Sequence, residues 1–259
     1  MEPLMGIVKK LLQRRETAGL LVGAITLLVV LLPLPLFAGA LALFSLAVGY
    51  ELELITGRKF LRWLSLGGYL FSLANPYWGL LFSSLSALGF GYFEVLKRMH
   101  YSHYTLLEFL LAFFTSIYGG LFISTFVEIK EHSTYLLLAL VLAIWGADTA
   151  AYYIGRYFGR NPFFGLISPK KTLEGFLGGL LVGTLIGTAV SSLEGYNSPG
   201  PLGWFFVVSV SAFGDLFESF IKRSFGVKDS SNLLGSHGGI LDRFDAMLFA
   251  SLALTALLN

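Results

Sequence analysis

Hydrophobic residues form long and almost uninterrupted stretches along the whole chain, and short polar segments separate them. A helix needs about 20 mostly apolar residues to cross a bilayer. Nine stretches reach or nearly reach this length, although the third is short: residues 17–34, 35–54, 60–74, 76–95, 105–127, 134–156, 172–193, 202–221 and 240–258. The pattern predicts an all-α integral membrane protein, a polytopic bundle of about nine transmembrane helices.

The composition supports the bilayer as the solvent of this chain. Hydrophobic residues make up 55% of the chain and charged residues 13%, and the mean hydropathy is +0.73. Soluble domains carry about 25% charged residues. Because the chain has no cysteine, disulfides and thiolate metal sites are excluded. The first stretch is longer than the roughly 7–15 apolar residues of a signal peptide, so we interpret it as a retained helix.

The basic residues predict the orientation of the chain. All but one of the 18 Lys and Arg residues lie before the first stretch or beside the polar segments that follow every second stretch, and Lys130 is the exception. Cytoplasmic segments of membrane proteins are enriched in Lys and Arg. We therefore expect a multi-pass protein of the cell inner (cytoplasmic) membrane, with the N-terminus in the cytoplasm and the C-terminus outside.

Acidic residues within the apolar stretches concentrate in the last four of them. An ionised side chain at the centre of a span costs about 2.5–3.5 kcal/mol on the insertion scale, so such residues commonly mark a functional site. They are Asp148, Glu174, Asp215, Glu218, Asp242 and Asp245. We divide the chain into N-terminal scaffold helices, residues 1–133, and a C-terminal catalytic region, residues 134–259, with its active site on the cytoplasmic side. Pairing of each acid with a neighbouring Lys or Arg is the alternative.

The spacing of these acids predicts a metal site. Asp215 and Glu218 stand at i and i+3 on one helix face, and so do Asp242 and Asp245. Carboxylates from different helices form a hard oxygen site that suits Mg²⁺. We expect Asp215 and Asp242 to bind Mg²⁺. Asp148, Glu218 and Asp245 are candidate catalytic residues that bind a second cation or orient the first ligands.

A basic loop before the seventh stretch is a candidate phosphate site. It ends in Ser168-Pro169-Lys170-Lys171-Thr172, and Glu174 follows in the next helix. The hydroxyl of Thr172 suits a helix cap, where it would accept a hydrogen bond from a free backbone N–H. A helix N-terminus beside two lysines attracts anions. An ordinary basic loop on the cytoplasmic side is the alternative.

Glycines recur at four-residue steps in the seventh stretch, at Gly175, Gly179, Gly183 and Gly187. Small residues at this spacing allow two membrane helices to approach closely. The face is therefore structural. It either packs within the chain or contributes to a homodimer.

The polar segment between the last two stretches, within residues 219–245, carries the densest set of reactive side chains. Gly238 and Gly239 precede a helix, and their backbone N–H groups suit phosphate oxygens. Four cations can neutralise phosphate charge: Lys222, Arg223, Lys228 and Arg243. His237 fits three roles, a general base, a phosphate hydrogen-bond donor or a residue that orders the loop, and the sequence leaves all three open.

This segment resembles the signature of the phosphatidate cytidylyltransferases, also called CDP-diacylglycerol synthases. The matching residues are Ser219, Lys222-Arg223, Lys228-Asp229, Ser231, His237-Gly238-Gly239, Asp242-Arg243 and Asp245. An upstream block is also similar: Trp145-Gly146-Ala147-Asp148-Thr149, Ala151-Tyr152, Gly155-Arg156 and Ser168-Pro169-Lys170-Lys171-Thr172 through Gly178-Gly179. The resemblance covers roughly residues 143–246. Gly235-Ser236 stands where the family often has Pro-Gly.

The resemblance implies that CTP and phosphatidate react to CDP-diacylglycerol and pyrophosphate in phospholipid biosynthesis. The expected partners are CTP and phosphatidate, and no nucleic acid is expected. The implied substrate-binding residues are Lys170, Lys171, Thr172, Glu174, Lys222, Arg223, Lys228, Asp229, Gly238, Gly239 and Arg243. A CTP-dependent polyprenol kinase, which would release CDP, is the closest alternative. A cation-coupled transporter is another, since acids within spans also mark ion pathways.

Overall fold

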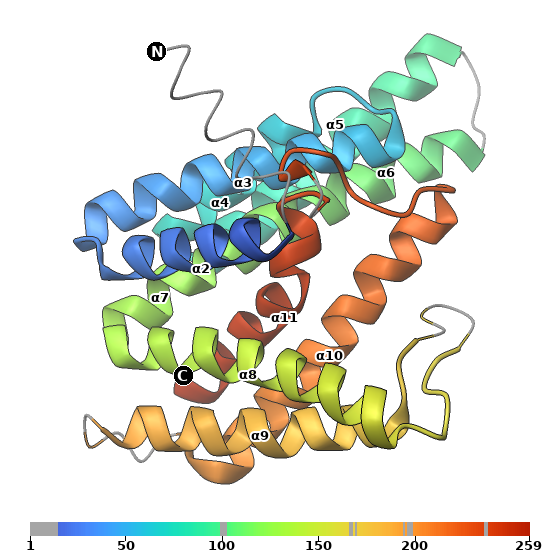
Figure 1. Cartoon of the computed structure of the whole chain (residues 1–259). Coiled ribbons are helices and arrows are strands. Elements are labelled where there is room, and N and C mark those ends of the chain that lie inside the picture. The colour runs from blue at the N-terminus through green and yellow to red at the C-terminus, as the bar shows by residue number, and fades with distance from the viewer. Residues whose placement is uncertain are drawn as a thin grey trace, which may run out of the picture. The chain divides into compact units, whose positions relative to one another are not determined.

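The computed structural model describes residues 15–98, 103–165, 168, 170–193, 195, 199–235 and 238–259. These residues fold into helices, as the hydrophobic pattern predicts, and an isolated antiparallel bridge joins Pro162 to Thr172. The helices are α2 (Arg15–Leu31), α3 (Leu34–Thr56), α4 (Leu61–Ala74), α5 (Pro76–Arg98), α6 (His103–Ser116), the π-helix η1 (Ile117–Leu121), α7 (Phe122–His132), α8 (Thr134–Phe158), α9 (Leu173–Ser192), α10 (Gly200–Ser224) and α11 (Leu241–Leu258) (Figure 1). Each predicted stretch corresponds to one helix, or to the run α6-η1-α7.

Six helical segments of the described chain are long and apolar enough to cross a bilayer: α3, α5, the run α6-η1-α7, α8, α9 and α10. The multi-pass prediction is confirmed. The other three predicted spans fall short for local reasons. Helix α4 has only 14 residues, and the apolar part of α2 covers Gly19–Leu31. Helix α11 carries Asp242, Arg243 and Asp245 at its start. The orientation of the termini stays a prediction.

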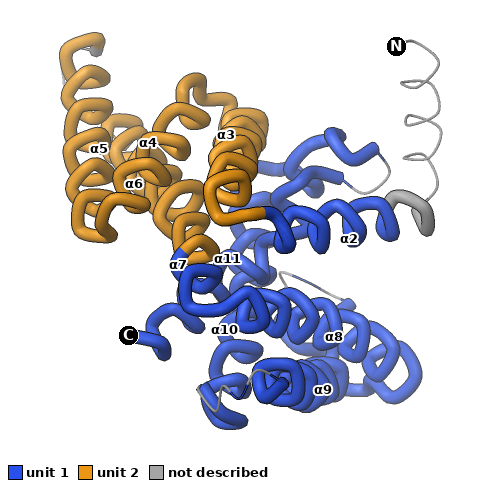
Figure 2. The backbone as a smooth tube through the Cα atoms, turned by 90° about the vertical axis from the view of Figure 1, so that its left-hand side faces the viewer, with its two compact units in different colours: residues 1–32, 128–259 blue, residues 33–127 orange. Residues whose placement is uncertain are grey.

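The chain forms two compact units, which Figure 2 colours separately. Unit 1 takes in residues 1–32 and 128–259, and unit 2 takes in residues 33–127. In unit 1, α2 packs against α8, and Lys130 of α7 donates a hydrogen bond to the carbonyl of Val30 near the end of α2. This bond satisfies a carbonyl that a helix end otherwise leaves free. Packing therefore joins α2 to the C-terminal half, while our functional division at residue 133 stays a prediction.

Unit 2 is a helix bundle held by small and hydroxylated residues. Ser45 donates to the carbonyl of Gly119 in the π-helix at 2.6 Å and lies 2.9 Å from the hydroxyl of Ser65. A π-helix has an irregular hydrogen-bond ladder, so the serine satisfies a carbonyl inside an apolar bundle. Charged side chains of this unit also pair with each other: Arg62 donates to Glu53 at 2.9 Å through Nε, and Arg58 pairs with Glu108. The scaffold role that we predicted for residues 1–133 stays a prediction.

The glycine face of α9 packs within the chain against α8. Gly175, Gly179 and Gly183 are buried, and a Cβ atom at Gly179 would lie 2.7 Å from the carbonyl oxygen of Ala147. Such a contact is too short for any residue larger than glycine. The prediction of close helix packing is confirmed. Because the face is used inside one chain, it gives no support to a homodimer.

Candidate active site

Unit 1 contains a cavity of about 480 Å³ between α8, α9, α10 and the loop that precedes α9. Its wall includes eight polar side chains: Asp148, Tyr152, Arg156, Lys170, Lys171, Thr172, Ser211 and Asp215. Aromatic and aliphatic side chains, among them Phe163 and Phe176, form the rest. The cavity therefore combines charges of both signs with an apolar wall, in a unit that crosses the bilayer.

Helix α8 contributes a stripe of polar side chains to this cavity. Asp148, Tyr152 and Arg156 follow one another at four-residue steps, so they lie on one helix face. Nη1 of Arg156 donates to the Tyr152 hydroxyl at 3.1 Å. Asp148 is exposed towards the cavity, and it is close enough to Asp215 of α10 for mutual repulsion.

The loop before α9 brings its lysines to the cavity by folding back on itself. The N–H of Phe163 donates to the carbonyl of Lys171 at 2.8 Å, and the N–H of Leu173 donates to the carbonyl of Asn161 at 2.9 Å. The Thr172 hydroxyl accepts from the N–H of Gly175 at 3.2 Å, so the predicted cap of α9 is confirmed. These bonds join the described ends of the loop to each other beside the start of α9.

Glu174 helps to hold this loop. Its carboxylate accepts from the N–H of Arg160 at 3.1 Å and from the side-chain amide of Asn161 at 2.7 Å. Glu174 is absent from the cavity wall. Its structural contacts are with the loop, while the substrate contact that the sequence implied for it stays a prediction.

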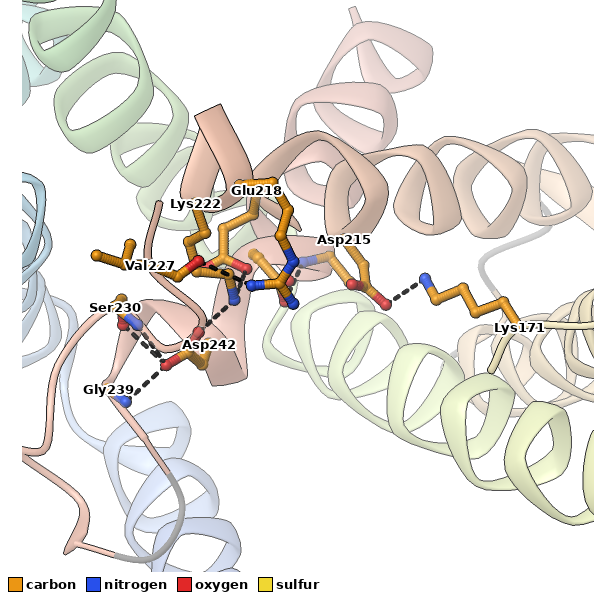
Figure 3. A network of polar contacts seen from close by, with 11 residues as sticks. Lys171, Asp215, Glu218, Lys222, Val227, Ser230, Gly239 and Asp242 are labelled. Atoms are coloured by element: carbon orange, nitrogen blue, oxygen red, sulfur yellow. Dashed lines mark hydrogen bonds and ion pairs between the residues drawn. The ribbon is translucent and has the colours of Figure 1, made fainter. Parts of the chain in front are cut away.

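Helix α10 carries acids and a lysine along one face, and Figure 3 shows their partners. Asp215 forms an ion pair with Lys171 at the cavity. One and two turns later, Glu218 and Lys222 are buried, and Nζ of Lys222 lies 2.5 Å from Glu218 Oε2 and 2.5 Å from Asp242 Oδ1. The sequence alternative, in which acids pair with lysines, therefore holds for Asp215, Glu218 and Asp242 in this structure.

Asp242 is also surrounded by hydrogen-bond donors from the segment between α10 and α11. Its Oδ2 accepts from the N–H of Ser230 at 2.9 Å, from the hydroxyl of Ser230 at 2.9 Å and from the N–H of Gly239 at 2.7 Å. Gly238 has a φ of +78°, and a Cβ atom there would lie 2.6 Å from Asp242 Oδ2. The two glycines thus fit around the carboxylate. The N–H of Gly239 that we assigned to phosphate is directed at Asp242 here.

The carboxylates of the site have the donor chemistry that Mg²⁺ prefers. Asp245 of α11 is buried and is repelled by both Asp148 and Asp215. Oε1 of Glu218 is buried and accepts no hydrogen bond from any described residue. Repulsion between carboxylates favours a bound cation, and an all-oxygen set is what Mg²⁺ prefers.

The residues therefore fit Mg²⁺ by chemistry. No three acids or histidines of the described chain already form a metal-sized cluster. In this structure Lys171 and Lys222 supply the positive charge instead.

Four further predicted residues are absent from the cavity wall. Arg223, Lys228, Asp229 and Arg243 have exposed side chains, and Nη1 of Arg223 donates to the carbonyl of Val227 at 2.8 Å. Their roles in substrate binding stay predictions. His237 lies outside the described residues.

Some cavity residues were not among the site residues that we predicted. They are Tyr152, Arg156, Phe163, Phe176 and Ser211. Two of them carried a signal in the sequence, because Tyr152 and Arg156 continue the four-residue spacing from Asp148. The phenylalanines carried none, since aromatic residues are frequent along the whole chain.

The chain is similar in sequence to known proteins. The sequence profile of the cytidylyltransferase family matches residues 12–259. A phosphatidate cytidylyltransferase of Aquifex aeolicus is 40% identical over 93% of this chain and 88% of its own length. Proteins of the same name from Bacillus subtilis and Staphylococcus saprophyticus are each 32% identical, over 82% and 91% of this chain and over 82% and 96% of their own lengths. On these matches, the chain belongs to the cytidylyltransferase family.

Proposed function

We propose that the chain is a phosphatidate cytidylyltransferase, which converts CTP and phosphatidate to CDP-diacylglycerol and pyrophosphate. The observation that carries this proposal is the cavity of unit 1, where carboxylates, cations and an apolar wall meet inside a membrane-spanning unit. A polar nucleotide and a lipid phosphate both find matching chemistry there. The named relatives, at 32–40% identity over most of the chain, supply the reaction.

The reaction needs charge neutralisation more than covalent help. A phosphate oxygen of phosphatidate attacks the α-phosphorus of CTP, and a new P–O bond forms. The bond from the α-phosphorus to the bridging oxygen breaks, and pyrophosphate leaves with the electron pair. Because both substrates are anions, positioned cations must lower their repulsion. Lys170 and Lys171 line the cavity and provide part of this charge.

The carboxylates give the site its acidic side. We propose that Asp215 and Asp242 hold Mg²⁺, and that Asp148, Glu218 and Asp245 serve a second cation or orient the first ligands. When bound, Mg²⁺ would stabilise charge on the reacting phosphates. The all-oxygen donor set supports this assignment, and the repulsion of Asp245 by Asp148 and Asp215 supports a cation beside Asp215.

The test is a product assay with the purified full chain in detergent. Labelled CTP, phosphatidate and Mg²⁺ should give lipid-linked CMP and pyrophosphate. Asp215→Asn should abolish most of this turnover, whereas Glu131→Gln, an exposed acid at the end of α7, should not. Formation of CDP and a phosphorylated lipid would identify a lipid kinase instead. Ion-driven uptake into vesicles without either product would identify a transporter.

We further propose that the protein lies in the inner membrane with its N-terminus and its cavity on the cytoplasmic side. The support is the placement of the basic residues. Since the chain has no native cysteine, single-cysteine variants give a direct test. Arg160→Cys should react with an impermeant thiol reagent only in inverted vesicles, and Glu131→Cys only in intact cells. The reverse pattern would refute the orientation. The homodimer stays a prediction, which the mass of the detergent-solubilised protein would test.

A further inference from the structure

Arg156 is a cavity residue to which neither the motif analysis nor the metal site assigns a task. It follows Gly155 in the upstream block of the sequence, and its side chain lines the cavity. We propose that Arg156 binds the phosphate of the lipid substrate and that Tyr152 positions it. This inference rests on the proposed function and adds a specific residue for the lipid half of the reaction.

The position of Arg156 separates it from the acidic part of the cavity. Asp148 and Arg156 are eight residues apart on α8, which corresponds to a rise of about 12 Å along the helix axis. Tyr152 lies halfway between them. Asp148 neighbours Asp215 and its partner Lys171, so the acids and that lysine occupy one part of the cavity. Arg156 offers a positive charge in another part of the same cavity.

The electrostatics favour an anion at Arg156. Lys171 is paired with Asp215, and Lys222 is buried between Glu218 and Asp242 outside the cavity wall. Lys170 also lines the cavity, but it lies on the loop before α9 and not on the α8 face that carries Arg156. No carboxylate of the described chain pairs with Arg156. Its guanidinium has five N–H donors, and Tyr152 accepts from only one of its nitrogens. The remaining donors suit a phosphate, which guanidinium groups bind through two parallel hydrogen bonds.

The surroundings of Arg156 favour the lipid as the source of that phosphate. Tyr153, Tyr157 and Phe158 are 51%, 70% and 68% exposed on the last turns of α8. Aromatic side chains at the end of a span gather at the level of the lipid headgroups. The guanidinium carbon lies 6.0 Å from the centre of the Tyr157 ring, so Arg156 lies at the same end of α8 as these aromatic side chains. The phosphate of phosphatidate lies at the same depth of the bilayer, whereas CTP enters from water.

Tyr152 is a positioning residue in this scheme. Its hydroxyl holds one side of the guanidinium one helical turn away and so reduces the number of conformations that the long side chain can adopt. A side chain that is already ordered loses less entropy when it binds. Removing the hydroxyl alone should therefore weaken lipid binding less than removing the guanidinium.

The test measures the apparent KM for each substrate in mixed micelles, with phosphatidate expressed as its mole fraction. Arg156→Ala should raise the KM for phosphatidate roughly 10- to 100-fold, as expected for a lost charged hydrogen bond, and leave the KM for CTP within about twofold. Arg156→Lys keeps the charge but cannot form two parallel hydrogen bonds. Its KM for phosphatidate should therefore lie between the values of the wild type and of Arg156→Ala. Tyr152→Phe should raise the KM for phosphatidate about two- to fivefold at unchanged kcat.

Arg160→Ala is the matched control. It removes an exposed arginine just after the end of α8, four residues away and outside the cavity wall, so it reports a general loss of surface charge. An unchanged KM for phosphatidate in Arg156→Ala, or an equal rise in Arg160→Ala, would overturn the proposal. A rise in the KM for CTP alone would assign Arg156 to the nucleotide and overturn it too. If the alanine variant aggregates, the lysine and Tyr152→Phe variants carry the same test. A wild-type protein that forms no CDP-diacylglycerol would refute the proposed function before this comparison begins.

Discussion

Lys222 offers the sharpest test of how the site is built. The sequence assigns it to substrate phosphate, but the structure buries it between two carboxylates, with exposed side-chain fractions of 9% for Lys222, 2% for Glu218 and 10% for Asp242. Lys171 forms a similar ion pair with Asp215, with exposed fractions of 31% and 34%. The perturbation is the same at both positions, Lys222→Met and Lys171→Met, which keep the length of the side chain and remove its charge.

The burial of the two pairs sets the expected magnitudes. Removing one partner of a buried ion pair costs about 3–5 kcal/mol, because the other charge stays buried and uncompensated. A partly exposed pair contributes about 0–1 kcal/mol, since water screens the charge that remains. Lys222→Met should therefore destabilise the protein by about 3 kcal/mol more than Lys171→Met. For a chain of this size, that difference corresponds to a midpoint shift on the order of 10 °C.

The assay is thermal unfolding of both variants and the wild type in one detergent at equal protein-to-detergent ratio. A double variant, Glu218→Gln with Lys222→Met, removes a carboxylate as well as the lysine and should recover part of the lost stability. Equal midpoints for Lys222→Met and Lys171→Met would refute the reasoning. A double variant less stable than Lys222→Met alone would show that uncompensated charge is not the cause.

Three further outcomes follow from local contacts. Gly179→Ala should lower the free energy of unfolding by about 1–3 kcal/mol, because its Cβ would lie 2.7 Å from the carbonyl oxygen of Ala147. Gly39→Ala is the control, since a Cβ there meets no atom within 4 Å and should not destabilise the fold. The unfolding midpoints of the two variants are compared. Thr172→Ala should cost about 1 kcal/mol through the lost cap of α9, and Thr172→Ser should restore it in the same measurement. Chelation of divalent cations should stop CDP-diacylglycerol formation and Mg²⁺ should restore it; turnover that persists in a chelator would contradict the magnesium assignment.

Local rules predicted much of this molecule. The apolar stretches predicted each helix. A membrane span must form its backbone hydrogen bonds within itself, so it requires a long apolar stretch that is visible in the sequence. Thr172 was recognisable as a cap, since its hydroxyl stands directly before a helix. The four-residue glycine spacing gave the close contact of α9 without naming its partner. In each case the deciding interaction lies within one helix or one helix face.

The partners of the charged residues could not be predicted in this way. Lys171 meets Asp215 across 44 positions of sequence, and Lys222 meets Asp242 across 20. Such pairs depend on how α10 packs against its neighbours, and periodicity gives the face of a helix but not what lies opposite. The role of Arg156 in the cavity could not be predicted for the same reason. Its four-residue spacing from Asp148 places both residues on one helix face but does not tell whether that face contacts lipid or a cavity.

Helix α10 connects the two parts of the site. Asp215 faces the cavity, and Lys222 lies seven residues later, about 10 Å along the axis, where it ties α10 to the start of α11 through Asp242. Asp242 in turn accepts hydrogen bonds from Ser230 and Gly239, so one buried network joins the end of α10 to these two residues and to the start of α11. A support of this kind holds the side chains of the cavity in fixed positions. The predicted substrate-binding lysines therefore divide by burial: Lys170 and Lys171 line the cavity, whereas Lys222 is buried in the network at the end of α10.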